Sequence, residues 1–271
     1  MARRKIRNLR VLLTGASSGI GYEMALQLVR MGANVLATAR RYEKLSLLTE
    51  ETKGFSGSLA IVPGDITEPS HRSSLIVWCE QHWGGLDVLI NNAGAGAIGP
   101  FSEASSERLR QVMEVDFFAP AELTRLCLPL LRKGNKPAIL NIGSVLGHRA
   151  VPNKSEYCAA KFAMRGWSES IRVELATERI EVLMVSPSTT RSEFFDSLLD
   201  SRSDVQSQSL GSMSAESVAK IAIASLVRSK REMIISWGGK ALVWFGRYFP
   251  SLTDRILVIG KSRGTDDFPI R

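Results

Sequence analysis

The sequence predicts a single doubly wound α/β domain, in which a parallel sheet of about seven strands carries helices on both faces. Short apolar runs alternate with longer amphipathic segments, as in βα units. No Pro-, Gly- or Ser-rich linker divides this series. The 271 residues, 44% of them hydrophobic and 23% charged, also suffice to bury the core of one large globular domain.

The first half of the chain gives three strands. "RVLLT" predicts the first strand, "IGYEMALQLVRMG" a helix that ends at Gly32, and "ANVLATA" the second strand. "LAIVPGD" predicts the third strand, and the helix after it begins near Pro69, because proline suits a first helical turn. Together these segments form the first βαβ unit and its continuation.

The second half continues the pattern with "LDVLINN", "PAILNIGS", "IEVLMVSP" and "EMIIS" as the fourth to seventh strands. Helices are predicted at about 105–131 and 154–177. The segment 187–213 is rich in Ser and Asp without periodicity, which predicts a mobile substrate loop with short helices. We therefore expect a domain over 1–237 and a C-terminal extension over 238–271.

The apolar side chains of this loop have two interpretations. They cover a lipophilic substrate, or they pack on the core, which is the default. The side chains concerned are Phe194, Phe195, Leu198 and Leu199.

The net charge and the cysteines limit the kind of partner and the cellular compartment that we expect. A net charge of +8 and a pI near 9.6 favour an anionic partner, such as a phosphorylated cofactor, nucleic acid or an acidic membrane surface. Part of this charge lies in "MARRKIRNLR", which we expect to be a solvated basic arm. Cys79, Cys127 and Cys158 lack metal-site spacing, and their odd number argues against a disulfide framework. Without a signal peptide or a spanning segment, a cytoplasmic protein is expected.

The stretch "TGASSGIG" follows the first strand and opens the first helix. Its glycines, Gly15, Gly19 and Gly21, allow a tight turn and a close approach of the backbone to a pyrophosphate. The N–H groups at the start of the helix face such an anion. The spacing differs from the common G-x-G-x-x-G, and a purely structural turn is the alternative.

The second strand ends in "ATARRYE". About 20 residues after the glycine turn, a site for NAD carries an acid, but here Arg40 and Arg41 are found. Guanidinium groups match the oxygens of a 2′-phosphate, so the sequence favours NADP(H) over NAD(H). The alternative makes both arginines exposed residues that open a helix.

Four motifs in this order resemble those of the classical short-chain dehydrogenase/reductase family, over about residues 8–237. They are the glycine turn at 14–21, the "NNAG" of 91–94, Ser144, and Tyr157 with Lys161. The resemblance implies a Rossmann-like fold and an oxidoreductase, for example a carbonyl reductase. Such an enzyme transfers hydride between a nicotinamide and the carbon of an alcohol, ketone or aldehyde.

Tyr157 and Lys161 are the predicted acid–base pair. Residues four apart share one helix face, so the ammonium lies near the phenol and lowers its pKa from the free value near ~10. Tyr157 then moves the proton, while the hydroxyl of Ser144, at the end of the fifth strand, holds the substrate oxygen. The resemblance also implies that Lys161 binds the nicotinamide ribose. An ordinary helix-face pair is the alternative.

The chain departs from the family at two places. Asp116 stands where the family has the asparagine of its catalytic tetrad; it preserves the backbone feature, or its carboxylate favours the lysine cation. Ser188 replaces the glycine that follows Pro187 in the family. Thr190 or Ser192 takes the contact with the cofactor amide, and we assign Thr190.

The cofactor site expected from these motifs draws on every strand end in the series. Asp65 resembles the adenine contact of the family, with a role at a helix entry as the alternative. No metal ligand is expected. The cofactor-binding residues are Gly15, Ser17, Ser18, Gly19, Ile20, Gly21, Arg40, Arg41, Asp65, Ile66, Asn92, Ala93, Gly94, Tyr157, Lys161, Pro187 and Thr190.

Outside these motifs, His148 either lines the substrate pocket or lies exposed, and a lone histidine favours exposure. Aromatic residues of the tail are interleaved with Lys240, Arg247 and Arg255. For the tail, subunit or domain packing ranks first, a peripheral membrane contact second and nucleic acid a distant third. A homodimer or homotetramer agrees with that order.

Two rival functions stay open. One is a non-catalytic NADP-binding regulatory protein, which Asp116 and Ser188 suggest. The other is an epimerase or dehydratase of related fold that uses a similar Tyr–Lys pair.

Overall fold

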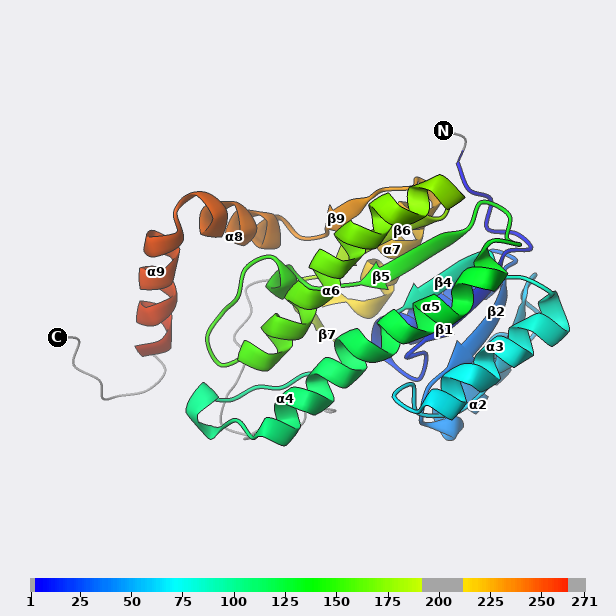
Figure 1. The fold of residues 1–271 in the computed structure, drawn as a ribbon, viewed down its shortest axis with the longest axis horizontal. Coiled ribbons are helices and arrows are strands. Elements are labelled where there is room, and N and C mark those ends of the chain that lie inside the picture. Colours follow the sequence, from blue (N-terminus) through cyan, green and yellow to red (C-terminus); the bar gives the residue numbers. More distant parts are fainter. Residues whose placement is uncertain (1–2, 192–211, 263–271) are drawn as a thin grey trace.

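The computed structural model describes residues 3–191 and 212–262, and its centre is the expected parallel sheet. Seven strands lie in the order β3-β2-β1-β4-β5-β6-β9, so the order reverses between β1 and β4 (Figure 1). A separate pair, β7 (Thr190–Arg191) with β8 (Met213–Ser214), flanks the segment 192–211. The strands of the main sheet are β1 (Arg10–Thr14), β2 (Asn34–Thr38), β3 (Ser58–Ile61), β4 (Val88–Asn91), β5 (Ala138–Ile142), β6 (Glu181–Ser186) and β9 (Glu232–Ile234).

Helices cover both faces of the sheet, as the doubly wound prediction requires. Helices α1, α2 and α7 pack on one face, and α3, α5 and α6 on the other, where α5 and α6 cross in front of the strands in Figure 1. Their bounds are α1 (Gly19–Arg30), α2 (Tyr42–Glu51), α3 (Pro69–Trp83), α4 (Ser106–Met113), α5 (Ala119–Leu131), α6 (Ser155–Glu174) and α7 (Ala215–Val227).

Each face of the sheet has its own apolar core. Successive side chains of a strand point to opposite faces, so Val11 and Leu13 pack with α1, α2 and α7, whereas Leu12 packs with α3 and α5. All three side chains are fully buried. Burial on both faces explains why these strands read as continuous apolar runs.

The helix expected over about 105–131 is interrupted. Between α4 and α5 lies one π-helical turn, Glu114–Phe118, which carries the fully buried Asp116. Such turns occur frequently at functional sites. The next predicted helix, at about 154–177, is confirmed as α6 followed by the short 3₁₀ turn Leu175–Glu178.

The N-terminal segment is not the solvated arm that we expected. Arg4, Ile6 and Leu9 are buried. The Arg4 guanidinium donates hydrogen bonds to the carbonyls of Leu226 and Lys136 at 2.7 and 2.8 Å, and it pairs with Glu181 at 2.9 Å. The expectation was wrong because three acceptors from distant segments compensate the buried charge.

Two further helices follow β9: α8 (Trp237–Tyr248) and α9 (Pro250–Ser262), which extend away from the sheet in Figure 1. Helix α8 lies against the 3₁₀ turn Val145–Gly147, and an ion pair between Arg149 and Asp254 holds α9. Within residues 3–191 and 212–262, no helix combines the length and apolar character needed to cross a bilayer.

Candidate functional site

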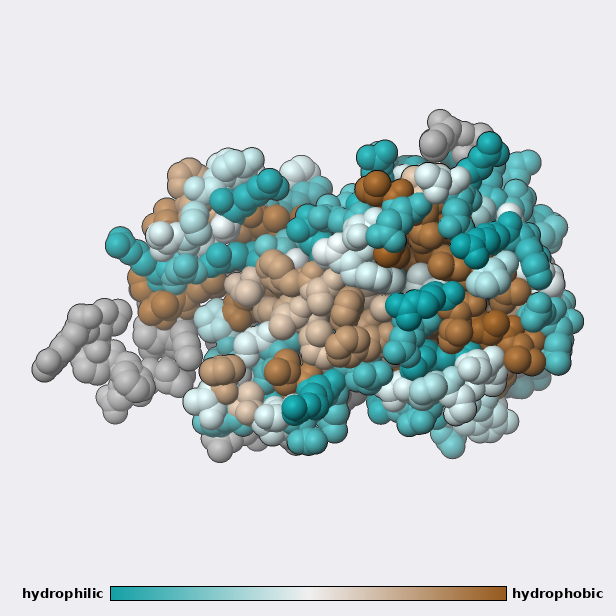
Figure 2. Space-filling view, viewed as in Figure 1, coloured by the Kyte–Doolittle hydropathy of each residue, from teal (hydrophilic) through white to brown (hydrophobic). Residues whose placement is uncertain are grey.

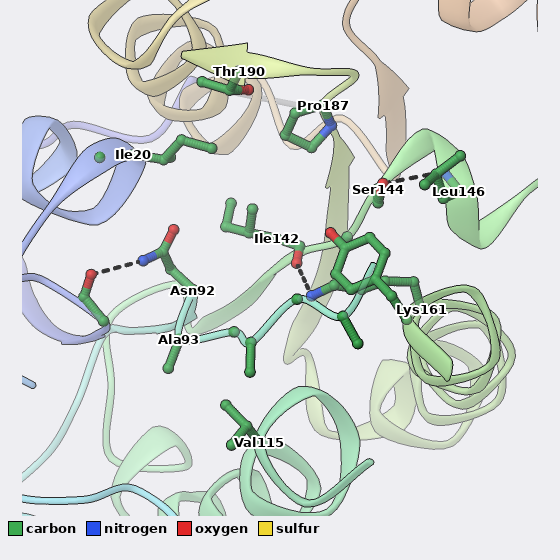
Figure 3. Close-up of a pocket in the computed structure, with 18 of the residues that line it drawn as sticks. Ile20, Asn92, Ala93, Val115, Ile142, Ser144, Leu146, Lys161, Pro187 and Thr190 are labelled. Atoms are coloured by element: carbon green, nitrogen blue, oxygen red, sulfur yellow. Dashed lines mark hydrogen bonds between the residues drawn. The ribbon is translucent and has the colours of Figure 1, made fainter. Parts of the chain in front are cut away.

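A cavity of about 1150 Å³ opens at the carboxyl ends of β1, β2, β4, β5 and β6. Ligands of open α/β sheets bind at this edge, where the strand order reverses. In Figure 3, Ile20 and Asn92 lie on one side of the pocket, Ser144 and Lys161 on the other, and Pro187 and Thr190 at a third edge. Residues far apart in the sequence thus surround one space.

The glycine turn forms one end of the cavity because its backbone touches the end of β4. Gly15 has a positive φ of 70°, and a Cβ there would lie 2.7 Å from the Cα of Ala93. A Cβ on Gly21 would lie 2.2 Å from the Gly15 carbonyl oxygen. The Asn92 amide nitrogen donates to the carbonyls of Thr14 and Gly15 at 3.0 and 3.1 Å. Only glycine fits at these positions, so the backbone is left bare beside the cavity.

Arg40, Arg41 and Asp65 line the same end of the cavity. Arg41 donates to the Ser17 hydroxyl from Nε at 3.2 Å and from Nη2 at 3.1 Å, which ties the end of β2 to the glycine turn. The side chain of Arg40 is 73% exposed, and its Nη1 is 4.0 Å from Oδ2 of Asp65. Two guanidinium groups therefore lie at the point where the sequence predicted a 2′-phosphate.

Asp65 also makes the contacts of the alternative that the sequence left open. Its Oδ1 accepts hydrogen bonds from the backbone N–H and the hydroxyl of Thr67, at 2.9 and 2.8 Å. These bonds hold the turn that leads into α3. The adenine role remains a proposal.

Ser144, Tyr157 and Lys161 meet at the other end of the cavity. Ser144 follows β5, and its hydroxyl accepts a hydrogen bond from the Leu146 N–H at 3.1 Å. Tyr157 and Lys161 both come from α6, with the Lys161 nitrogen 5.5 Å from the centre of the phenol ring. Lys161 also donates to the Ile142 carbonyl at 3.4 Å (Figure 3). The end of β5 and helix α6 thus bring these three side chains together, as the sequence predicted.

Asp116 lies behind Lys161 and does not line the cavity. Its side chain is 0% exposed, and Oδ1 is 3.4 Å from the Lys161 nitrogen. The same oxygen accepts a hydrogen bond from the Ala95 N–H at 3.1 Å, while Oδ2 has no hydrogen-bond partner among the residues that the structure describes. The π-helical turn thus places the Asp116 carboxylate beside Lys161, whose ammonium lies near the phenol of Tyr157.

The electrostatics of these groups differ from the sequence-based expectation. Burial raises the pKa of Tyr157 above its ordinary value; Lys161 lowers it, Asp116 raises it, and a hydrogen bond to Ser144 lowers it. The lowering by Lys161 is present, but burial and Asp116 outweigh it. Without a ligand, the phenol therefore stays protonated at neutral pH.

The partners of the phenol shift as well. Burial lowers the pKa of Lys161, but Asp116 and Tyr157 outweigh it, so this pKa is raised. Burial also raises the pKa of Asp116 against the attraction of Lys161. Lys161 therefore stays positively charged at neutral pH.

A buried chain of amides fixes α6 to the sheet. The side-chain nitrogen of Asn91 donates to the Thr124 hydroxyl at 3.0 Å and to the side-chain oxygen Oδ1 of Asn141 at 2.8 Å. Asn141 in turn donates to the Ser168 hydroxyl at 2.8 Å. This chain joins α5, β4, β5 and α6, so the helix that carries Tyr157 is held by three other elements.

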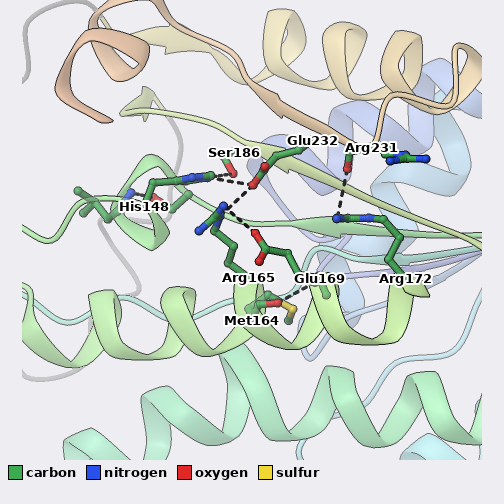
Figure 4. A network of polar contacts seen from close by, with 11 residues as sticks. His148, Met164, Arg165, Glu169, Arg172, Ser186, Arg231 and Glu232 are labelled. Atoms are coloured by element: carbon green, nitrogen blue, oxygen red, sulfur yellow. Dashed lines mark hydrogen bonds and ion pairs between the residues drawn. The ribbon is translucent and has the colours of Figure 1, made fainter. Parts of the chain in front are cut away.

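His148 belongs to a second polar network, drawn in Figure 4. Its side chain is only 5% exposed, so the expected exposure was wrong. A hydrogen bond of 2.9 Å joins Nε2 to the hydroxyl of Ser186, the last residue of β6, and Glu232 lies 3.7 Å away. Glu232 also accepts from Arg165 of α6 at 2.9 Å. Burial and Arg165 lower the pKa of His148, which leaves a neutral ring that links β6, β9 and α6.

Some residues of the cavity wall were missed by the sequence analysis. Lys154 lies three residues before Tyr157, a spacing that could have placed it on the same helix face. Its ammonium is half-buried, and burial lowers its pKa. Leu242 and two glycines of α8 also line the cavity, and no local signal in the sequence links that helix to Tyr157.

Nearly all of the predicted site residues line this one cavity. Gly21 and Asp116 stand behind its wall. Ser192, Phe194, Phe195, Leu198 and Leu199 lie outside the described residues. The residues on the wall are Gly15, Ser17, Ser18, Gly19, Ile20, Arg40, Arg41, Asp65, Ile66, Asn92, Ala93, Gly94, Ser144, Tyr157, Lys161, Pro187 and Thr190.

The chain is similar to proteins of one family. The family model described as short chain dehydrogenase matches residues 10–203. The uncharacterized oxidoreductase YxnA of Bacillus subtilis is 32% identical over 262 residues, which cover 94% of this chain and 72% of that protein. The ketoacyl reductase HetN of Nostoc sp. is 29% identical over 253 residues, which cover 91% of this chain and 87% of HetN.

Solved structures share the fold. A short-chain dehydrogenase/reductase from Burkholderia phymatum, in complex with NAD, has a TM-score of 0.83 at 19% identity and covers 98% of this chain and 100% of its own. A short-chain dehydrogenase from Burkholderia cenocepacia, in complex with NADP, has a TM-score of 0.78 at 23% identity, covering 94% and 99%. At these identities the likeness concerns the fold alone.

Proposed function

The chain belongs to the short-chain dehydrogenase/reductase family of oxidoreductases, and from that premise we propose an NADP(H)-dependent alcohol dehydrogenase or carbonyl reductase. One observation carries the proposal. Ser144, Tyr157 and Lys161 meet at one end of a cavity whose other end is built from a bare glycine turn and two arginines. The substrate is an alcohol, ketone or aldehyde.

The cavity fits a dinucleotide in two respects. A backbone that tolerates no Cβ at Gly15 and Gly21 leaves N–H groups open to a pyrophosphate, which the turn 15–20 would hold. Arg40 and Arg41 would bind a 2′-phosphate, with Asp65 and Ile66 at the adenine. When bound, the nicotinamide supplies the acceptor or donor of hydride.

The remaining contacts of the cofactor follow from the other strand ends. Asn92, Ala93 and Gly94 would lie along the adenosine half, and Lys161 would bind the nicotinamide ribose. Pro187 and Thr190 would contact the amide. These roles rest on the positions of the residues around the cavity and on the family resemblance.

The chain's own residues would move the proton. In the oxidation of an alcohol, the Ser144 hydroxyl hydrogen-bonds the substrate oxygen, and Tyr157 as phenolate accepts the hydroxyl proton. Lys161 stabilises the phenolate, and Asp116 holds Lys161 at 3.4 Å. In the reduction of a carbonyl, Tyr157 donates its proton to the new alkoxide. The raised pKa of Tyr157 in the ligand-free protein means that the phenol needs a further positive charge to act as a base.

Turnover with a panel of aldehydes and ketones, followed as NADPH consumption, tests this proposal. We expect Tyr157→Phe to lower kcat by about 10²- to 10⁴-fold while it retains NADPH binding, because only the proton transfer is lost. Full turnover by Tyr157→Phe on any active substrate would refute the proton role.

The two rivals predict different outcomes of the same assay. A regulatory protein binds NADPH and turns over no member of the panel; Asp116 and Ser188, which depart from the family, favour it. An epimerase or dehydratase oxidises NADPH only transiently, without net consumption.

We also propose a cytoplasmic protein that forms a homodimer or homotetramer and binds no nucleic acid. The three cysteines are free and buried, which agrees with a reducing compartment. Phe118 of the π-helical turn, Leu126 of α5 and Phe162 of α6 are exposed apolar side chains that a second copy would cover. Light scattering that reports a monomer at micromolar concentration would contradict the assembly.

A further inference from the structure

The largest group of exposed apolar side chains in the described part of the chain lies on α8 and α9. On α8, Trp237, Trp244 and Tyr248 are spaced by seven and four residues, so they form one stripe along the helix. Trp237 is 85% exposed and Tyr248 is 61% exposed. On α9, Leu252, Ile256 and Ile259 form a second stripe. Figure 2 shows brown side chains over these two helices, on the left of the view.

Basic residues flank both stripes. Lys240 and Arg247 lie seven residues apart along one edge of the α8 stripe, and Arg255 lies beside the α9 stripe. The Lys240 nitrogen is 4.7 Å from the centre of the Trp237 ring. None of the three cations forms an ion pair within residues 3–191 and 212–262. We call the two stripes with these three cations the outer face.

The inner side of α8 holds Leu242, which lines the cavity, and two glycines in close contact with the domain. A Cβ on Gly239 would lie 2.7 Å from Cγ2 of Val145, and one on Gly246 would lie 2.5 Å from Cδ of Arg149. A surface helix of a globular protein normally turns its large apolar residues inward. Helix α8 turns Leu242 inward to the cavity but leaves the three aromatic residues of its stripe exposed, so packing on its own domain, which the sequence favoured together with subunit packing, does not use these aromatic residues.

We propose that the outer face docks on the surface of an anionic lipid bilayer. Aromatic rings lie at the headgroup boundary of membranes, where one part of the ring is apolar and another is wet. Lys240, Arg247 and Arg255 bury their apolar stems beside the rings and place their charges on anionic headgroups. This arrangement is that of an interfacial amphipathic helix, which binds without spanning.

Charge separates this occupant from a second copy of the chain. Between residues 237 and 262 the sequence holds one acidic residue, Asp254, which is already paired with Arg149. In a twofold contact, the same patch meets itself, so these cations would face cations. Lysine, present here as Lys240, is also depleted at protein interfaces. A deformable anionic lipid surface can bury the apolar side chains of both stripes and place negative charge beside all three cations.

The test is sedimentation of the full chain with vesicles, which requires no turnover and so stays independent of the proposed activity. We expect binding to vesicles of phosphatidylcholine with about one third phosphatidylglycerol, weaker binding to pure phosphatidylcholine, and a decrease with added salt. Replacement of Lys240 and Arg247 by Glu lowers the affinity by at least about 25-fold, at about fivefold for each cation removed. Trp244→Ser also weakens binding.

Two matched variants are controls: Leu47→Ser on α2 and Lys220→Glu on α7 remove exposed groups of the same kinds elsewhere and leave binding unchanged. Circular dichroism checks that every variant is folded. Absence of binding to anionic vesicles, or equal binding by the Glu variant, would overturn the proposal. A dimer that Trp244→Ser dissociates would overturn it too, because the outer face would then belong to a second copy.

Discussion

Asp116 puts a second charge behind Lys161, where the family has an amide. The carboxylate raises the pKa of Lys161 and, through space, that of Tyr157 as well. It therefore strengthens the cation while it makes the phenol harder to ionise. The sequence predicted the first effect, but not the second, because burial and the relative position of three side chains decide the balance.

Asp116→Asn should separate these effects. Oxidation of an alcohol requires the phenolate, so kcat/KM rises with pH through the pKa of Tyr157. Since the Asp116 charge raises this pKa, the amide should move the rise to lower pH. The pKa of Lys161 falls as well, so any loss of rate at high pH should also move to lower pH. A pH profile of kcat/KM that stays in place, or that moves upward, would contradict this account.

At the cofactor end, Arg40 gives the most direct test of the NADP preference. Its guanidinium is largely exposed and has only a distant carboxylate, so it is available to a phosphate. Arg40→Ala should raise the Kd of NADPH by about 10- to 100-fold, the loss of a charge-assisted contact, and leave the Kd of NADH nearly unchanged. Fluorescence titration measures both. Arg110→Ala on α4 is the control, and an unchanged NADPH affinity for Arg40→Ala would remove the basis of the preference.

At the scale of elements, the sequence predicted what local chemistry decides. The strands followed from apolar runs, and the glycine turn from its spacing after β1. The π-helical turn at Glu114–Phe118 was missed because its extra residue is stabilised by contacts across the fold, including the Asp116 bond to Ala95. The contribution of α8 to the cavity was missed for the same reason. Both depend on packing between segments that are distant in sequence.

The glycine turn allows a sharp comparison of two glycines. Gly21→Ala places a Cβ against the Gly15 carbonyl and the Asn92 amide, so it should lower the free energy of unfolding by about 3 kcal/mol or more. Gly166→Ala, on the exposed side of α6 with nothing within 4 Å, should instead raise it by about 0.5–1 kcal/mol. Urea denaturation measures both, and similar effects of the two substitutions would show that the close contact is not rigid.

At the scale of the whole molecule, the net charge alone does not show which basic residues are accessible to an anionic partner. Part of the net charge of +8 is used inside the fold: Arg4 joins the N-terminus to α7 and β6, and Arg10 pairs with Asp87 at 2.7 Å. Lys240, Arg247 and Arg255, by contrast, lie on the outer face and form no ion pair with any residue that the structure describes. A sum over the sequence contains no information about which charges end up paired.

Arg4 should therefore matter for stability far more than its terminal position suggests. Arg4→Met removes the guanidinium that donates to two carbonyls and pairs with the carboxylate of Glu181, and should lower the free energy of unfolding by about 2–3 kcal/mol. Lys5→Met, at the exposed neighbouring position, should change it by less than about 0.5 kcal/mol. Thermal and urea denaturation compare the two, and equal stability would mean that the segment is not tied to the sheet.

One side of helix α8 lines the cavity, and its opposite side belongs to the outer face. If docking on the outer face shifts α8 and so changes the affinity of the cavity for its ligand, thermodynamic reciprocity requires the converse. A tightly held substrate analogue must alter the affinity for that exterior partner by the same factor.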